Sequence, residues 1–253
     1  LKGIGIGIGI VAFGLSASLQ AAVPERTIDT FITSEMPASG VPGLAYAVVA
    51  DGKIKTVGAR GVVNIGGDKP VTPDTAFLTG SISKSFTALA VMQLVEAGKI
   101  NLDTEVSHYL GVFSGQPAGS IPIRQLLSHT SGFSTLQGNV SDVGHVGGKD
   151  ALARRVDGLA RVVPENTPGA KWEYSNRNYQ ILGRLVEVVS GQDYPTYVET
   201  HILDPVGMEH SFVSDGEIHE EMATGHRPWF GAKRPMALSK TRRSYAPQGG
   251  VVA

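Results

Sequence analysis

A serine and a lysine stand three residues apart where an apolar segment of the sequence begins. Residues 79–85 read TGSISKS, and residues 86–97 are mostly apolar, which predicts a buried helix that Gly98 ends. Positions i and i+3 lie on one face of a helix, so Ser81 is expected beside Lys84. A lysine that is partly removed from water near the positive end of a helix loses its proton more readily. The neutral amine can then accept the proton of a serine hydroxyl, and the pair predicts nucleophilic catalysis.

The same helix start has a second interpretation, in which the serines serve only as caps. A capping box places Glu or Gln three residues after the capping serine, but Lys84 stands there, and a cation in the first turn opposes the helix dipole. Capping therefore explains the serines but not the lysine. Ser83 and Ser85 are rival nucleophiles, yet neither is followed by a lysine at the third position. A single S-x-x-K is a weak signal of catalysis, because serine and lysine are both common residues.

Tyr174 and Asn176 form the second candidate group, in the sequence YSN that precedes a predicted helix ending at Gly191. A tyrosine hydroxyl can pass a proton between a lysine and a leaving group. An asparagine side chain can bond a lysine and a substrate carbonyl or amide. The structural alternative makes Asn176 an N-cap and Tyr174 a partly buried aromatic residue. These residues alone leave both interpretations open.

A third group, SHTSGF at residues 128–133, contains a histidine two residues before a serine. His129 and Ser131 suggest a Ser–His pair, but they stand in what reads as a tight turn, and the chain has no G-x-S-x-G elbow. We interpret the segment as a structural turn that shapes the pocket wall. The seven histidines show no metal-binding spacing, so neither a metal nor a cofactor is expected.

The order and spacing of four motifs resemble the serine β-lactamase-related hydrolases. These motifs are S-x-x-K at Ser81, LLSHTSGF from Leu126, YSN at Tyr174 and LDPVGM from Leu203. That family holds class C β-lactamases, D-alanyl-D-alanine carboxypeptidases and β-lactamase-like esterases, and the resemblance covers roughly residues 26–253. It implies that Ser81 is the acylated nucleophile and Lys84 its activating base. It also implies that Tyr174 and Asn176 form the second motif, with Tyr174 catalytic and Asn176 binding the substrate.

The predicted fold class is α+β, of the β-lactamase/transpeptidase type, with an antiparallel sheet and a helical subdomain. Strands are expected at residues 43–50 and 53–61, joined at the Asp51–Gly52 turn signal. Helices are expected near residues 23–38, 121–127, 150–161, 176–190 and 193–203, and a Gly-rich surface excursion at residues 134–149.

The resemblance also implies a missing part. The family's third motif, K-T-G or H-x-G, lies on a strand expected beyond residue 253, so the C-terminal part of the sheet is expected to be absent from this chain. One of the two oxyanion-hole N–H groups comes from that strand, and losing such a donor typically costs about 10²–10³ in rate.

Composition and the N-terminal residues bear on partners and location. The chain has 253 residues, a formal net charge of −1 and no cysteine, which gives no indication of nucleic-acid binding and excludes thiol chemistry. The basic stretch at residues 226–243 is interpreted as a solvated loop. Residues 1–22 resemble a signal peptide, which leaves residues 23–253 as the hydrolase domain. We expect an exported, periplasmic or extracellular protein, with membrane association only through an uncleaved leader or the missing C-terminus.

The predicted function is that of a serine hydrolase that forms an acyl-enzyme with a small-molecule or peptidoglycan-derived substrate. A β-lactam, a D-alanyl peptide and a carboxylic ester all fit, because the motifs are common to enzymes of all three kinds. The alternative is a catalytically silent family member that binds peptidoglycan fragments or a protein partner. The presence of both Ser81 and Lys84 argues against this alternative.

Overall fold

The computed structural model describes residues 25–140, 148–214, 222–229, 232–235 and 243–253. The predicted leader lies outside these residues. The chain divides into two compact units, residues 1–39 and residues 40–253. The described part of the first unit is one helix, α1 (Glu25–Ser39), close to the range predicted. Within the described part of the chain, no helix combines the length and the apolarity that crossing a bilayer requires.

The second unit begins with the predicted hairpin, in which β1 (Gly43–Ala50) pairs antiparallel with β2 (Lys53–Gly61). Asp51 and Gly52 have φ values of 53° and 68°. Positive φ at both central residues is what a type I′ turn requires, so the turn chemistry and the strand register agree.

The S-x-x-K segment forms two consecutive helical elements. Ser81 lies in a 3₁₀ turn, η1 (Gly80–Ile82), which runs into α2 (Ser83–Glu96). No serine caps α2, because its N-cap residue is Ile82 and no side chain makes a cap hydrogen bond. The helix is also less buried than its composition predicts: Leu89 and Met92 are 48% and 44% exposed.

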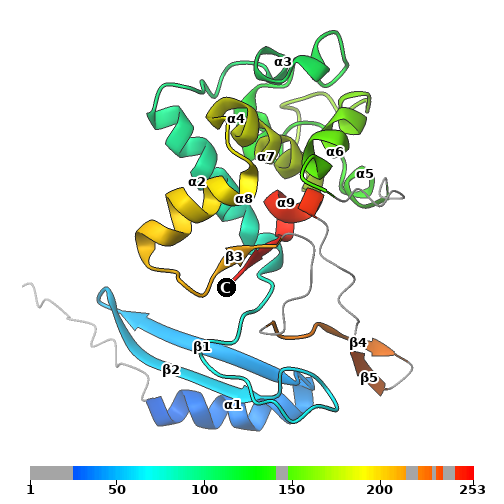
Figure 1. Cartoon of the computed structure of the whole chain (residues 1–253). Helices are drawn as coiled ribbons and strands as arrows, with labels where there is room; N and C mark the ends of the chain where they lie inside the picture. Colours follow the sequence, from blue (N-terminus) through cyan, green and yellow to red (C-terminus); the bar gives the residue numbers. More distant parts are fainter. Residues whose placement is uncertain (1–24, 141–147, 215–221, 230–231, 236–242) are drawn as a thin grey trace, which may run out of the picture. The chain divides into compact units, whose positions relative to one another are not determined.

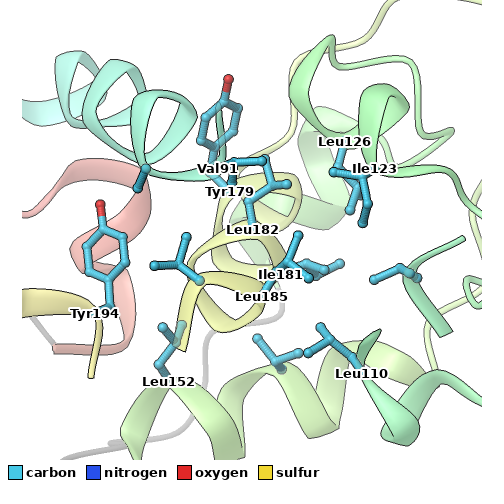
Figure 2. Close-up of a cluster of buried hydrophobic side chains, with 14 of the residues drawn as sticks. Val91, Leu110, Ile123, Leu126, Leu152, Tyr179, Ile181, Leu182, Leu185 and Tyr194 are labelled. Carbon is cyan, nitrogen blue, oxygen red and sulfur yellow. The ribbon is translucent and has the colours of Figure 1, made fainter. Parts of the chain in front are cut away.

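The core of the second unit is built around α7 (Asn176–Ser190), which lies among other helices in Figure 1. Its apolar side chains Tyr179, Leu182, Leu185 and Val186 recur at helical spacing and are buried. These side chains pack among residues of neighbouring helices, including Val91 of α2 (Figure 2). The helices with the most extensive contacts to α7 are α2, α4 (Ile123–Leu127), α6 (Ala151–Ala160), α8 (Tyr194–Val198) and α9 (Ala246–Gly249).

Shorter elements complete the helical part. The predicted helix at 193–203 is formed by α8 followed by a π-helical segment, η3 (Glu199–Leu203). The excursion predicted at residues 134–149 begins instead with a helix, α5 (Thr135–Val140), and residues 141–147 lie outside the described residues. The remaining short helices are α3 (Val106–Tyr109), η2 (Gly111–Phe113), η4 (Asp204–Val206) and η5 (Arg243–Tyr245).

Two further strand pairs stand among the described residues, and neither was predicted. β3 (Phe212–Val213) pairs with β6 (Val251–Val252), and β4 (His226–Trp229) pairs with β5 (Ala232–Pro235). The interpretation of residues 226–243 as a solvated loop was therefore wrong for β4 and β5. A two-stranded pair tolerates proline, because an N–H on the outer edge of a strand has no ladder partner to lose.

Candidate active site

The structure brings Ser81, Lys84 and Tyr174 together, although Tyr174 is far from the other two in sequence. The Ser81 Oγ atom lies 2.7 Å from the Tyr174 Oη atom, and the Lys84 ammonium group donates a hydrogen bond of 3.1 Å to Ser81 Oγ. Ser81 is exposed, whereas Lys84 is only 6% exposed. A hydroxyl that solvent can reach is therefore held by a buried amine and a phenol.

The position of Ser81 is fixed by the strand at the end of the described chain. The Thr79 N–H and hydroxyl both donate to the Val251 carbonyl, at 3.0 and 2.8 Å. The Val251 N–H in turn donates to the Ser83 hydroxyl at 2.9 Å, and this hydroxyl lies 3.1 Å from Thr79 Oγ1. Ser83 is completely buried. The rival serine is thus part of the joint between α2 and β6, and it is closed to a substrate.

Lys84 has a second partner that the motifs did not reveal. Its Nζ atom donates a 2.7 Å hydrogen bond to the backbone carbonyl of Gln248, in α9. Helix α9 is held there by Thr87, whose hydroxyl donates 2.6 Å to the Pro247 carbonyl. Because a hydroxyl has one proton to give, the Tyr194 hydroxyl, 2.7 Å from Thr87 Oγ1, must be the donor in that pair. A backbone carbonyl can be supplied by any residue type, so no sequence signal marked Gln248.

The surroundings of Lys84 shift the balance between its two protonation states. Burial lowers the pKa of Lys84 below its ordinary value of 10.5, and hydrogen bonding and charge interaction with Tyr174 oppose this effect. The Nζ atom lies 4.9 Å from the centroid of the Tyr174 ring and 5.8 Å from that of Tyr179, and both rings favour the charged form. The net direction is downward, as the sequence predicted, and desolvation is the largest cause.

The second motif, Tyr174 and Asn176, spans the entry to α7. Tyr174 precedes the helix and is half-buried, and its carbonyl accepts a 2.6 Å hydrogen bond from the Thr135 hydroxyl. Asn176 is the first residue of α7, and the N-cap position belongs to Ser175, which makes no side-chain cap bond. The capping interpretation of Asn176 was therefore wrong.

The segment SHTSGF forms the predicted turn after α4. His129 and Gly132 have φ values of 58° and 87°. Ser131 is completely buried, and its hydroxyl donates 2.6 Å to the side-chain carbonyl of Asn178. His129 packs against Tyr174, the residue whose hydroxyl faces Ser81. Among the residues that the structure describes, no group of three or more His, Asp or Glu side chains is placed to hold a metal ion.

The mixed helix and strand fold and the trio of Ser81, Lys84 and Tyr174 together indicate a protein family. The family model described as Beta-lactamase matches residues 28–253. The chain therefore belongs to the β-lactamase family, which is a family of serine hydrolases. Among curated proteins, it is 40% identical over 175 residues to "Penicillin-binding protein 4" of Amycolatopsis lactamdurans. That match covers 68% of this chain and 44% of the relative.

Solved structures agree with this assignment. The octameric penicillin-binding protein homologue from Pyrococcus abyssi superimposes with a TM-score of 0.75 at 28% identity, over 90% of this chain and 53% of that one. The D-alanine carboxypeptidase AmpC from Burkholderia cenocepacia gives a TM-score of 0.73 at 28% identity, over 90% and 60% of the two chains. The predicted family and the β-lactamase/transpeptidase-like fold are confirmed. The chain spans about half the length of these relatives.

Proposed function

We propose that the protein is a serine hydrolase that works through an acyl-enzyme formed on Ser81. The observation that carries the proposal is the hydrogen-bonded trio, in which Ser81 Oγ lies 2.7 Å from the Tyr174 hydroxyl and 3.1 Å from the Lys84 amine. A serine hydroxyl at its ordinary pKa is a weak nucleophile, and an adjacent base activates it. Both neighbours are within the distance that proton transfer requires.

The proposed reaction has two stages. In the first, the neutral Lys84 amine accepts the Ser81 proton, directly or through the Tyr174 hydroxyl, while Ser81 Oγ bonds to the substrate carbonyl carbon. The bond from that carbon to the leaving nitrogen or oxygen then breaks, and the leaving atom takes up the proton by way of Tyr174. In the second stage, water adds to the acyl-enzyme, releases the carboxylic acid and returns the proton to Ser81.

Two further roles belong to the same proposal. The Ser81 backbone N–H, in η1, is proposed as one donor to the oxyanion that forms on the carbonyl oxygen. Asn176, two residues after Tyr174 in the chain, is proposed to bind an amide or carbonyl of the substrate through its side chain, which can both donate and accept.

The proposed substrate is a small molecule or a fragment derived from peptidoglycan, with an acyl carbonyl next to a leaving group. β-Lactams, D-alanyl peptides and carboxylic esters share this chemistry. Relatives named as a penicillin-binding protein and a D-alanine carboxypeptidase support the class as a whole. We also propose that residues 1–22 direct export to the periplasm or the extracellular space, where peptidoglycan-derived substrates occur.

A catalytically silent protein is disfavoured by the state of Lys84. Lys84 is 6% exposed, and burial makes its charged form less stable. Burying a charge without a compensating carboxylate is costly, and an apolar residue at this position would avoid that cost. A lysine retained at such a cost is expected to have a chemical role.

Covalent labelling tests the proposal. The protein is treated with a fluorescent penicillin or a fluorophosphonate, and mass spectrometry locates the adduct. We expect the adduct on Ser81, and we expect Ser81→Ala to abolish it while the fold remains. Ser85→Ala is the matched control, because it removes a nearby hydroxyl on the exposed side of α2. An adduct on Ser83 or Ser131 would overturn the assignment of the nucleophile.

A further inference from the structure

His129 is bonded to the chain on both sides of Tyr174. Its carbonyl oxygen accepts a 2.8 Å hydrogen bond from the Glu173 N–H, and its Nδ1 atom accepts a 3.2 Å hydrogen bond from the Ser175 N–H. Tyr174 lies between these two anchored residues. One histidine therefore restrains the backbone immediately before and immediately after the phenol that faces Ser81.

The imidazole also packs against the phenol itself. Its centroid lies 4.7 Å from that of the Tyr174 ring, with the planes tilted by 34°, and 5.2 Å from that of Tyr179. The exposed ring of Trp172 meets His129 edge-on at 6.2 Å. Backbone and ring contacts together leave Tyr174 little freedom to swing away from Ser81.

Hydrogen bonds around Nδ1 fix the form of His129. The Asn178 side-chain oxygen receives the Ser131 hydroxyl, so the Asn178 amide nitrogen is the atom that faces Nδ1, at 3.1 Å. Nδ1 thus meets two donors, from Ser175 and Asn178, and it can accept from them only when it carries no proton. The proton of the neutral ring must then reside on Nε2.

The charges and titratable groups that face His129 favour the neutral ring. They are Lys84 from α2, Tyr174 from the preceding loop and Tyr179 from α7. The carboxylate of Glu173 instead pairs with Lys171. Burial, followed by the charge of Lys84, lowers the pKa of His129 from 6.5 to about 4.

The backbone conformation of His129 is a second indication that its side chain has a functional role. Its φ of 58° is a conformation that glycine adopts freely and that is strained for other residues. Strained residues of this kind tend to occur where the side chain is needed. Glycine would relieve the strain but would remove both Nδ1 and the ring.

We propose that His129 is the positioning residue of the acylation reaction: its carbonyl, Nδ1 and ring hold the Tyr174 hydroxyl against Ser81. The inference rests on the proposed function and goes beyond the turn and pocket-wall role that the sequence predicts. His129 acts through Tyr174, and we assign it no direct contact with the reacting atoms.

Two variants that both suit a positive φ test the role of Nδ1. His129→Gly removes the acceptor and the ring, whereas His129→Asn keeps an acceptor oxygen one bond beyond Cγ, where Nδ1 stands. We expect the Gly variant to slow acylation by a fluorescent penicillin roughly tenfold to a hundredfold, since misplacing a catalytic group by about 1 Å costs on this order. The Asn variant should recover part of that loss. Equal rates in both variants would contradict the role of Nδ1.

A double-mutant cycle separates positioning from general stability. If His129 acts through the Tyr174 hydroxyl, His129→Gly should change the acylation rate by no more than about twofold once Tyr174→Phe has removed that hydroxyl. Loss by the same factor in both backgrounds would overturn the proposal. His108→Asn is the matched control, because this exposed histidine also packs on a tyrosine, Tyr109, and we expect it to leave acylation unchanged.

Nitrogen NMR of the wild-type imidazole gives a readout that needs no turnover. We expect His129 to carry its proton on Nε2 and to remain neutral until the pH falls to about 4. A ring that carries its proton on Nδ1 near pH 7 would overturn the inference. Wild-type protein that is not acylated on Ser81 would instead refute the proposed function, so the two failures are distinguishable.

Discussion

Lys84 is the residue on which the proposed chemistry depends most directly. The amine must be neutral to accept the Ser81 proton, and arginine, which remains charged, cannot do so. We therefore predict that Lys84→Arg is nearly inactive in acylation although it can still occupy the site beside the Gln248 carbonyl. Acylation kinetics alongside a thermal melt measure this effect. Wild-type rates in a folded Lys84→Arg protein would exclude general-base chemistry at this position.

His129 also makes stability depend on pH. In the unfolded chain, histidine binds a proton below about pH 6.5, whereas folded His129 stays neutral until about pH 4. Between these values the unfolded state binds more protons, so stability falls as the pH falls. The partly buried ring should contribute a loss on the order of 1–3 kcal/mol at the acid end.

Denaturant unfolding above pH 6.5 and at pH 4 measures this loss. We predict that His129→Asn loses less stability across the window than the wild type, because its side chain does not titrate. All other histidines are common to the two proteins, so their contributions cancel. Identical pH profiles would show that the imidazole is not held neutral by folding.

At the scale of elements, the site depends on how closely α7 approaches α9. Gly183 of α7 faces Pro247 of α9, and a Cβ atom added at Gly183 would overlap the proline ring. Helix α9 carries the carbonyls that accept from Thr87 and Lys84. We predict that Gly183→Ala pushes α9 away, lowers the melting temperature and slows acylation together.

Gly158 provides the matched control for this substitution. It lies in α6 on an exposed turn, and a Cβ atom added there would meet no neighbour within 4 Å. Alanine at an open helical position is favoured over glycine by about 0.5–1 kcal/mol. Gly158→Ala should therefore raise stability and leave acylation unchanged. A Gly183→Ala protein that behaved in the same way would show that α9 does not need this close approach.

The elements also show how far the sequence predicts the structure. Spacing and turn signals predicted the hairpin, the helix ends at Gly98 and Gly191, and the meeting of Ser81 with Lys84. Strand β6 has only two residues, too few for an alternating pattern, and so its joint with Ser83 was not foreseen. The role of the Gln248 carbonyl was also missed, because a backbone acceptor depends on where the chain runs and not on residue type.

At the scale of the molecule, apolar surface remains open on the described residues. Leu89 and Met92 of α2 are about half exposed, and Val49 and Ile54 of the hairpin are 64% and 67% exposed. Among the described strands, β1 pairs only with β2, which leaves its other edge open. Such surfaces and edges favour aggregation.

The chain spans 44% of the penicillin-binding relative and 60% of the carboxypeptidase. We predict that a protein extended to the relatives' length covers these faces with further strands, is more soluble and hydrolyses substrate faster than the 253 residues alone. Thermal melts and hydrolysis of an ester and a β-lactam, measured side by side, test this. A cooperative melt and full activity from the shorter protein would contradict it.

The joint between α2 and β6 has a kinetic consequence. The hydrogen bonds from Lys84 to Gln248 and from Val251 to Ser83 span 164 and 168 positions, and the contact between Ser81 and Tyr174 spans 93. Contacts of such long range form late, because a large loop must close first. We therefore expect Ser81, the proposed nucleophile, to be unreactive on the ribosome until Gln248 and Val251 have been synthesised and have docked. During refolding, labelling of Ser81 should lag behind the recovery of helical signal, and simultaneous recovery would contradict this order.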